Sequence, residues 1–185
     1  WSSRLTLVPL AHAELCASLA NVKSPEVRVV NGLDQRKTSL VARFVHSTLS
    51  EKYLTTVGVK VDSKEVAPPG RAPMKLVVWD IAGRSQLDSL NMTYLRGASA
   101  LLLVADGTRE RSLHAALNLL MQSRTLLPDA TIALAVNKLD LVEQWEVAPA
   151  ALAELRRSLP VHETSARSGA GVEAAFADIA TRLAQ

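Results

Sequence analysis

The sequence has little of what marks secreted or membrane-spanning proteins. Cys16 is the only cysteine among 185 residues, so no disulfide can form within the chain, which is typical of a reducing compartment. No apolar run approaches the roughly 18–20 residues that span a bilayer. The first residues also lack a basic segment followed by an apolar stretch, as a secretory signal would have. We therefore expect a cytoplasmic protein, and the chain itself does not support membrane association.

Aromatic residues and blocks of like charge are scarce as well. Aromatics make up 4% of the chain, which leaves few side chains on which single-stranded nucleic acid could stack. The 21 basic and 18 acidic residues are interspersed and give a net charge of +3, whereas nucleic-acid binding needs a concentrated basic patch. With 48% hydrophobic residues, the composition is that of an ordinary globular domain. We expect no nucleic-acid partner, and the oligomeric state is not indicated.

Short apolar runs alternate with amphipathic segments from residue 26 to the end. The runs predict strands at Val27–Val30, Val57–Val66, Met74–Trp79, Ala100–Ala105, Thr131–Val136 and Pro160–Glu163. The amphipathic segments predict helices at Thr38–His46, Ser112–Leu127, Val147–Ser158 and Val172–Leu183. Several strands are apolar at successive positions, which is typical of a parallel sheet covered on both faces, so we expect an α/β fold. Residues 67–73 leave no room for a helix, and the strands they join should be antiparallel.

Residues 1–25 do not continue this alternation and are expected to form an N-terminal extension to a domain at 26–185. Arg4–Leu10 alternates like a strand, and Ala11–Ala20 has the composition of a short helix. We favour a strand and helix added at the sheet edge, and the alternative is the tail of a preceding domain. The start at Trp1 instead of a methionine is consistent with a piece of a longer protein.

The tetrapeptide Asn137-Lys138-Leu139-Asp140 directly follows a predicted buried strand. In open α/β sheets, ligands bind beyond the carboxyl ends of the strands. The carboxylate of Asp140 could accept from both N1–H and the exocyclic amine of guanine, an arrangement that adenine does not satisfy. Asn137 could hold the loop, and the aliphatic stem of Lys138 could cover the base. A plain polar turn is the simpler interpretation, but the setting favours a base site.

Two other segments end predicted strands in the same way. Glu163-Thr164-Ser165-Ala166-Arg167 follows the last strand, and its small residues would let backbone N–H groups approach a base carbonyl. Trp79-Asp80-Ile81-Ala82-Gly83 offers a carboxylate for Mg²⁺ and a glycine N–H for a terminal phosphate. Each segment alone would be an ordinary loop or turn, so their weight comes from their joint occurrence.

A phosphate-binding loop is expected after the first strand, but its sequence is degenerate. The pattern G-x-x-x-x-G-K-[ST] is matched at Lys37 and Thr38, in the correct strand–loop–helix setting. Asn31 and Arg36 replace the two glycines whose backbone N–H groups would approach the phosphates.

Together these segments resemble the Ras superfamily of small GTPases, most closely its Rab branch, over residues 26–185. Residues 53–59 and 94–98 are similar to the first switch and the end of the second switch, and residues 106–109 to the stretch after the fourth strand. The resemblance implies the P-loop NTPase fold, with a mostly parallel six-stranded sheet, one antiparallel edge strand and helices on both faces. It also implies GTP or GDP and Mg²⁺ as ligands.

The resemblance assigns roles residue by residue. Lys37 would bind the β- and γ-phosphates, and Gly83 would sense the γ-phosphate. Mg²⁺ would be held by Thr38, Thr56 and Asp80, the last through water. The remaining nucleotide-binding positions are Asp34, Gln35, Arg36, Ser39, Asn137, Lys138, Asp140, Ser165, Ala166 and Arg167. An effector surface for protein partners would include Val61, Trp79 and Tyr94.

The departures from the family lie where triphosphate chemistry happens. Arg84 stands where the family has the glutamine that orients the attacking water, and arginine has no acceptor for that water. Asp34 places a carboxylate beside the phosphates, although Arg36 partly compensates. We expect a switch with slow or absent GTP hydrolysis, and the alternative is a pseudo-GTPase scaffold without nucleotide. An ATP-using enzyme is disfavoured by Asp140. No prenylation cysteine follows the last predicted helix, so a lipid anchor either belongs to a removed tail or is not used.

Overall fold

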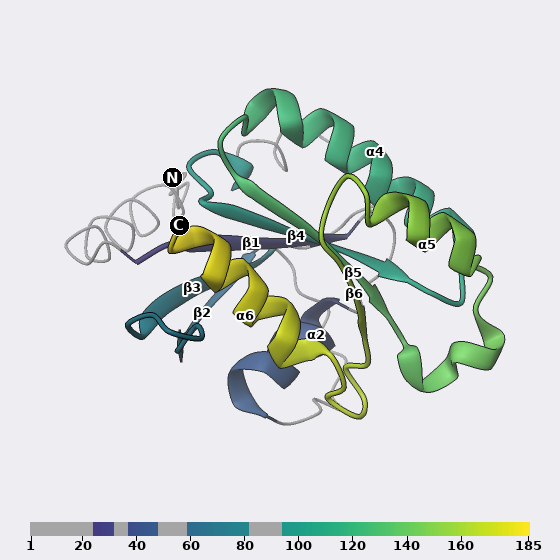
Figure 1. The fold of residues 1–185 in the computed structure, drawn as a ribbon, viewed down its shortest axis with the longest axis horizontal. Coiled ribbons are helices and arrows are strands. Elements are labelled where there is room, and N and C mark those ends of the chain that lie inside the picture. The colour runs from purple at the N-terminus through teal and green to yellow at the C-terminus, as the bar shows by residue number, and fades with distance from the viewer. Residues whose placement is uncertain (1–23, 32–36, 48–58, 82–93) are drawn as a thin grey trace, which may run out of the picture.

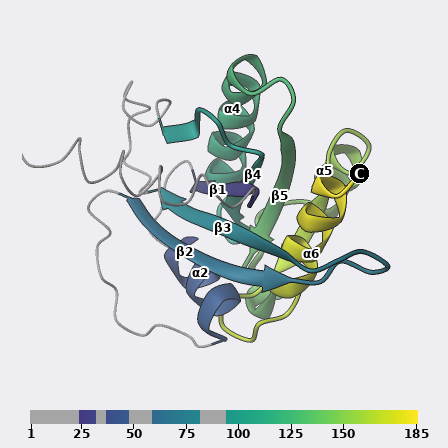
Figure 2. The same cartoon turned by 90° about the vertical axis from the view of Figure 1, so that its left-hand side faces the viewer.

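The computed structural model describes residues 24–31, 37–47, 59–81 and 94–185, and the predicted extension lies almost wholly outside them. Its six strands are β1 (Glu26–Asn31), β2 (Val59–Val66), β3 (Met74–Ile81), β4 (Ala100–Asp106), β5 (Thr131–Asn137) and β6 (Val161–Thr164). They form one sheet in the order β2-β3-β1-β4-β5-β6. Only β2 and β3 pair in antiparallel fashion among these neighbours, as residues 67–73 predicted. Figure 2 shows this pair at one edge.

Helices cover both faces of the sheet, as expected for an α/β fold. Helices α4 (Glu110–Leu126) and α5 (Pro149–Leu155) lie on one face, while α2 (Lys37–His46) and α6 (Val172–Leu183) lie on the other (Figure 1). A short 3₁₀ helix, η1 (Leu139–Gln144), follows β5. None of the described helices is long and apolar enough to cross a membrane.

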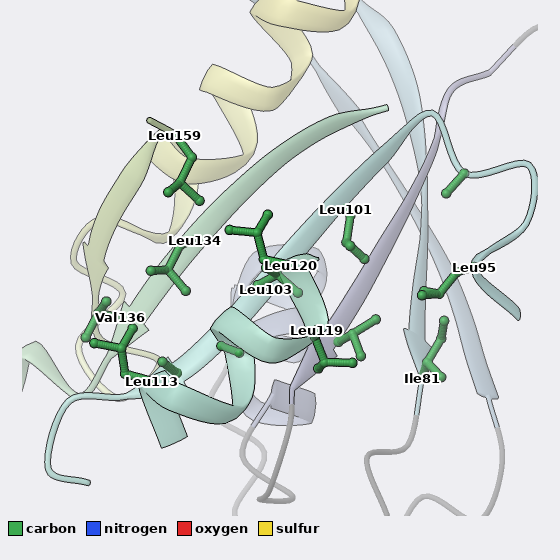
Figure 3. Packing of buried hydrophobic residues seen from close by; sticks show 14 of the residues in the cluster. Ile81, Leu95, Leu101, Leu103, Leu113, Leu119, Leu120, Leu134, Val136 and Leu159 are labelled. Atoms are coloured by element: carbon green, nitrogen blue, oxygen red, sulfur yellow. The ribbon is translucent and has the colours of Figure 1, made fainter. Parts of the chain in front are cut away.

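Two hydrophobic clusters, one on each face, hold these layers together. All seven residues of β4 are buried, because the strand is central and covered from both sides. Leu101 and Leu103 pack toward α4, as Figure 3 shows, whereas Leu102 belongs to the cluster on the opposite face. There the rings of Phe44 and Phe176 stack with centroids 3.7 Å apart and join α2 to α6.

Some elements differ in extent from their predictions. Helix α5 was expected over Val147–Ser158 but spans only seven residues. Pro149 stands at the start of the helix, where its missing N–H costs nothing, and Val147 is buried in the core before the helix begins. The 3₁₀ helix η1 was not predicted, because a six-residue segment carries no clear hydrophobic period.

Candidate functional site

The carboxyl ends of the parallel strands bring the predicted motifs to one edge of the sheet. In the strand register, Asp106 at the end of β4 pairs with Asn137 at the end of β5, and Asn137 pairs with Thr164 at the end of β6. The tetrapeptide after β5 and the loop after β6 are therefore neighbours. Sequence reasoning placed both at strand ends, and the parallel register makes them adjacent.

Asn137 joins the end of β5 to the loop that follows β6. Its side-chain oxygen accepts hydrogen bonds from the backbone N–H of Ala166, at 3.0 Å, and from the hydroxyl of Thr164, at 3.4 Å. The residue is only 5% exposed, and a buried amide is stable only when its polar atoms are paired. These hydrogen bonds attach the end of β5 to the loop after β6.

Asp140 is oriented by the same loop. The hydroxyl of Ser165, which is fully buried, donates to Oδ1 of Asp140 at 2.5 Å. The side chain of Asp140 is 19% exposed, and the guanidinium of Arg167 lies 3.9 Å from its Oδ2. A carboxylate that is held by one hydroxyl and partly open to solvent suits a ligand with two neighbouring N–H donors, as guanine has.

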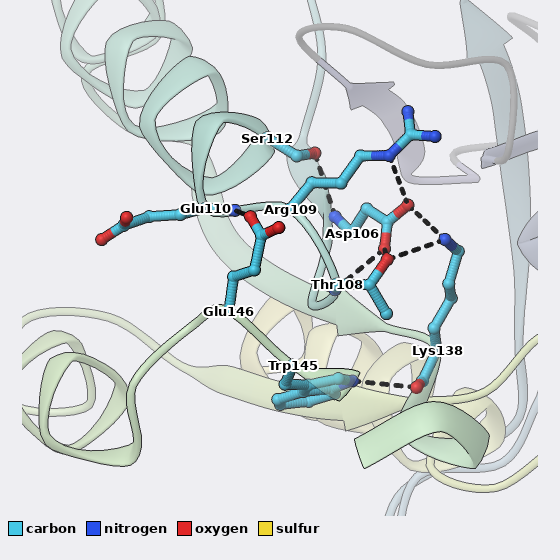
Figure 4. A network of polar contacts seen from close by, with 8 residues as sticks. All are labelled: Asp106, Thr108, Arg109, Glu110, Ser112, Lys138, Trp145 and Glu146. Atoms are coloured by element: carbon cyan, nitrogen blue, oxygen red, sulfur yellow. Dashed lines mark hydrogen bonds and ion pairs between the residues drawn. The ribbon is translucent and has the colours of Figure 1, made fainter. Parts of the chain in front are cut away.

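Lys138 is held by a polar network at the end of β4 (Figure 4). Its ammonium lies 2.6 Å from Oδ2 of Asp106 and donates to the hydroxyl of Thr108 at 3.0 Å. That hydroxyl and the N–H of Thr108 donate to Oδ1 of Asp106, at 2.7 and 3.0 Å. Burial works to raise the pKa of Asp106, but the hydrogen bonds from Lys138 and Thr108 outweigh it and hold the pKa below its ordinary value. Asp106 is therefore an ionised partner for Lys138.

Arg43 contacts the loop after β6 from α2, on the face of the sheet opposite to α4. Its Nε donates to the carbonyl of Ala166 at 2.9 Å, and its NH2 group donates to the carbonyl of Arg167 at 2.6 Å. Arg43 therefore links the helix that follows the predicted phosphate loop to the loop after β6. Sequence reasoning missed this residue, since an arginine on an amphipathic helix is usually solvated.

The predicted phosphate and magnesium positions are described in part. Lys37, Thr38 and Ser39 are the first three residues of α2. Asp80, near the end of β3, is fully buried and pairs in register with Val29 of β1. A buried carboxylate and a hydroxyl in the first turn of a helix are oxygen donors of the kind that Mg²⁺ prefers, so Asp80 and Thr38 fit the predicted ion. The predicted residues outside the described ranges are Asp34, Gln35, Arg36, Thr56, Gly83 and Arg84.

The predicted effector residues lie together on the α4 side of the sheet. Val61 on β2 pairs with Trp79 on β3, and Tyr94 packs on the same hydrophobic cluster. Trp79 is only 5% exposed, and the buried guanidinium of Arg28 lies 4.0 Å from its ring centroid. Arg28 also donates from Nε to the carbonyl of Tyr94 at 2.7 Å. This buried arginine, which sequence reasoning did not single out, ties Trp79 to the segment at Tyr94.

Comparison with known proteins points to one family. The sequence model of the Ras family matches residues 30–185 of this chain. The Ras-related protein Rab-4 of Dictyostelium discoideum is 36% identical over 143 residues, which are 76% of this chain and 69% of that protein. The Ras-related protein Rab-30 of Homo sapiens is 34% identical over 80% of this chain and 73% of its own length. The Ras-related protein RABF2a of Arabidopsis thaliana is 35% identical over 80% and 74%.

Proposed function

This chain belongs to the Ras family, and on that premise we propose that it is a guanine-nucleotide switch that hydrolyses GTP slowly or not at all. It is a Ras-superfamily small GTPase close to the Rab branch. Its six-stranded sheet, with one antiparallel strand and helices on both faces, is the fold of such proteins. The observation that carries the proposal is the assembled base site, in which Asn137 and Asp140 are bonded to the loop after β6.

The described residues have chemistry suited to guanine and to a magnesium-bound phosphate chain. Asp140 would accept hydrogen bonds from N1–H and the exocyclic amine of guanine. Asn137 and Ser165 hold the loops after β5 and β6 next to each other. Asp80 and Thr38 would hold Mg²⁺ at the carboxyl edge of the sheet, a role supported by the oxygen atoms that they offer there. When bound, this ion neutralises charge on the phosphate oxygens.

Slow hydrolysis is proposed from the identity of residue 84. In this family the position carries a glutamine that orients the attacking water, and this chain has Arg84. Arginine offers five donors and no acceptor, so it cannot accept a hydrogen bond from that water. The arginine could stabilise charge on the phosphates, but the nucleophile would have no residue to orient it.

A pseudo-GTPase scaffold is the second candidate, and the composition of the phosphate loop favours it. In the predicted loop, Asp34 would add a negative charge beside the phosphates, and Arg36 stands where the family has a glycine. In either case, we propose cytoplasmic protein effectors or regulators as partners. They would contact the half-buried Val61 and Tyr94, whereas Trp79, which was predicted for the same surface, is buried in the cluster beneath them.

The test is the identity of the nucleotide that the purified protein binds. We expect GDP or GTP among the small molecules released on denaturation, and tighter binding of GDP than of ADP in calorimetric titrations. Asp140→Ala removes two hydrogen bonds to a charged group, so GDP affinity should fall about a hundredfold or more. Asp129→Ala changes an exposed aspartate just before β5, at the amino-terminal ends of the strands and away from the candidate site. It should leave the affinity unchanged. Equal affinity for ADP and GDP would contradict the proposal.

A further inference from the structure

Trp145 lies just after η1, and its side chain contacts the backbone of Lys138, between Asn137 and Asp140 in the sequence (Figure 4). Its indole Nε1 donates to the carbonyl of Lys138 at 2.9 Å. The N–H of Leu141 donates to the same carbonyl at 2.8 Å. The peptide group between Asn137 and Asp140 is therefore held by two donors, one of which comes from outside the turn.

Lys138 needs such support because of its backbone conformation. Its φ of 73° lies in the left-handed region, and among the described non-glycine residues only Ser47 shares a positive φ. Such conformations persist where the surrounding contacts determine them, and they occur often at functional sites. The carbonyl that Trp145 binds belongs to this residue, so the indole acts on the point where the chain turns toward Asp140.

Trp145 is itself fixed in place by Gly107. A Cβ atom built on Gly107 would overlap the indole ring, so the ring rests directly on the glycine backbone. The carbonyl of Gly107 accepts from the N–H groups of Glu146 and Val147, at 3.0 and 3.3 Å, and its N–H donates to the carbonyl of Asn137 at 3.0 Å. Only glycine at position 107 leaves room for the indole, and the N–H of Gly107 is hydrogen-bonded to Asn137 of the base motif.

From this geometry we propose that Trp145 is a positioning residue for guanine recognition. By holding the carbonyl of Lys138, it keeps the turn in the conformation that presents Asp140 to the base. Binding groups keep a productive geometry only when a supporting layer of side chains restrains them. The inference rests on the proposed function, because it concerns how the same site recognises its ligand.

Trp145→Phe tests the hydrogen bond, since phenylalanine keeps a ring against Gly107 but has no donor. Gly107→Ala tests this contact, because the methyl group must displace the indole while leaving its N–H intact. The matched control is Ser123→Ala, which deletes another side-chain donor to a backbone carbonyl, the 3.0 Å bond to Leu120. Ser123 is buried eleven residues beyond Ser112 along α4, away from the base site.

Two measurements are made on each protein. In the nucleotide-free form, hydrogen exchange of the Leu141 amide reports on the turn, and we expect it to be about fivefold faster in Trp145→Phe and in Gly107→Ala. Calorimetry then compares GDP with IDP, whose base lacks the exocyclic amine. We expect both variants to bind GDP about fivefold more weakly and to lose part of the preference for GDP over IDP, whereas Ser123→Ala keeps both values.

The outcomes separate this inference from the proposed function. Unchanged exchange of Leu141, or an unchanged ratio of GDP to IDP affinity in a protein that binds GDP, would overturn the role of Trp145 alone. A loss of GDP affinity that is shared by IDP in the same proportion would also overturn it, because that is the result of general destabilisation. Failure of the unsubstituted protein to bind GDP would overturn the proposed function and this inference together.

Discussion

At the scale of single residues, the carboxylate of Asp106 shows how the fold controls charge near the site. It is 6% exposed, and its pKa lies below the ordinary value because hydrogen bonds from Lys138 and Thr108 outweigh its burial. The folded protein therefore binds this proton less tightly than the unfolded chain does. The resulting stabilisation is complete above the ordinary carboxyl pKa of about 4 and is lost as the pH falls through the lowered value.

Asp106→Asn should remove this stabilisation. We expect the free energy of unfolding at pH 7 to fall by about 1.5–3 kcal/mol, the contribution of hydrogen bonds to a charged group. The variant should also lose less stability than the unsubstituted protein between pH 5 and pH 2. Urea denaturation at several pH values measures both effects, with the exposed Asp129→Asn as the control. Parallel pH profiles for Asp106→Asn and the unsubstituted protein would show that this carboxylate has no such role.

We expect Arg84 to decide the rate of GTP hydrolysis. Because an arginine side chain has no acceptor for the attacking water, single-turnover cleavage of GTP should be slower than the intrinsic rate of Ras, on the order of 10⁻⁴ s⁻¹. Arg84→Gln should raise the rate, measured as phosphate release from preloaded protein without any partner. A rate at or above that reference in the unsubstituted protein would mean that another group orients the water.

At the scale of elements, Arg43 binds α2 to the loop between β6 and α6. It donates to the carbonyls of Ala166 and Arg167, which lie more than a hundred residues away in the sequence, and to the carbonyl of Ser47 at the end of its own helix. The stacked rings of Phe44 and Phe176 join α2 to α6 and restrict the distance between these two helices. The loop that carries Ser165 is thus held both by Arg43 of α2 and by the side chain of Asn137.

Arg43→Gln should loosen this loop without unfolding the sheet. We expect faster amide exchange at Gly169, whose N–H donates to the carbonyl of Ser165 at 2.8 Å, and a loss of about 1–2 kcal/mol in the free energy of unfolding. Arg182→Gln removes an arginine that pairs with Asp178 on the exposed side of α6, and it should change neither value appreciably. Equal rates of amide exchange at Gly169 in both variants would show that Arg43 does not hold the loop.

At the scale of the whole molecule, nucleotide binding should stabilise the fold if this domain is a switch. A ligand at about a hundred times its dissociation constant adds about 2.7 kcal/mol to the free energy of unfolding. A scaffold without nucleotide would unfold at the same temperature with or without Mg²⁺–GDP. Thermal unfolding therefore separates the two candidate functions.

The double substitution Asp34→Gly and Arg36→Gly sharpens this comparison. It removes a negative charge and a bulky side chain from the predicted phosphate loop, so a weakened switch should bind GDP about tenfold more tightly. The melting temperature in millimolar Mg²⁺–GDP should rise correspondingly, and calorimetry gives the affinity directly. If neither protein responds to GDP, the scaffold is the correct function.

The amino-acid pattern by itself determined the layers of the fold and the strand ends at which the proposed base-binding residues lie. Every position of β4 is apolar or small up to Asp106, and such a strand is stable only between two layers of helices. Asn137 ends β5, and Asp140 and Ser165 follow the ends of β5 and β6, so all three lie at one edge of the sheet, because parallel strands share the direction of their carboxyl ends. The hydrophobic period of a segment and the order of strands and motifs along the chain can both be read from the sequence alone.

Only the tertiary structure decided what supports these residues. The contact of Arg43 with Ala166 spans 123 positions in the sequence, and that of Arg28 with Tyr94 spans 66. The fit of Trp145 against Gly107 likewise depends on how the turn after η1 meets the end of β4. None of these residues stands out in the sequence, since an arginine on a helix, a tryptophan in a loop and a glycine after a strand are all commonplace. Their roles come from crossovers and side-chain packing, which bring distant segments into contact and which no local pattern encodes.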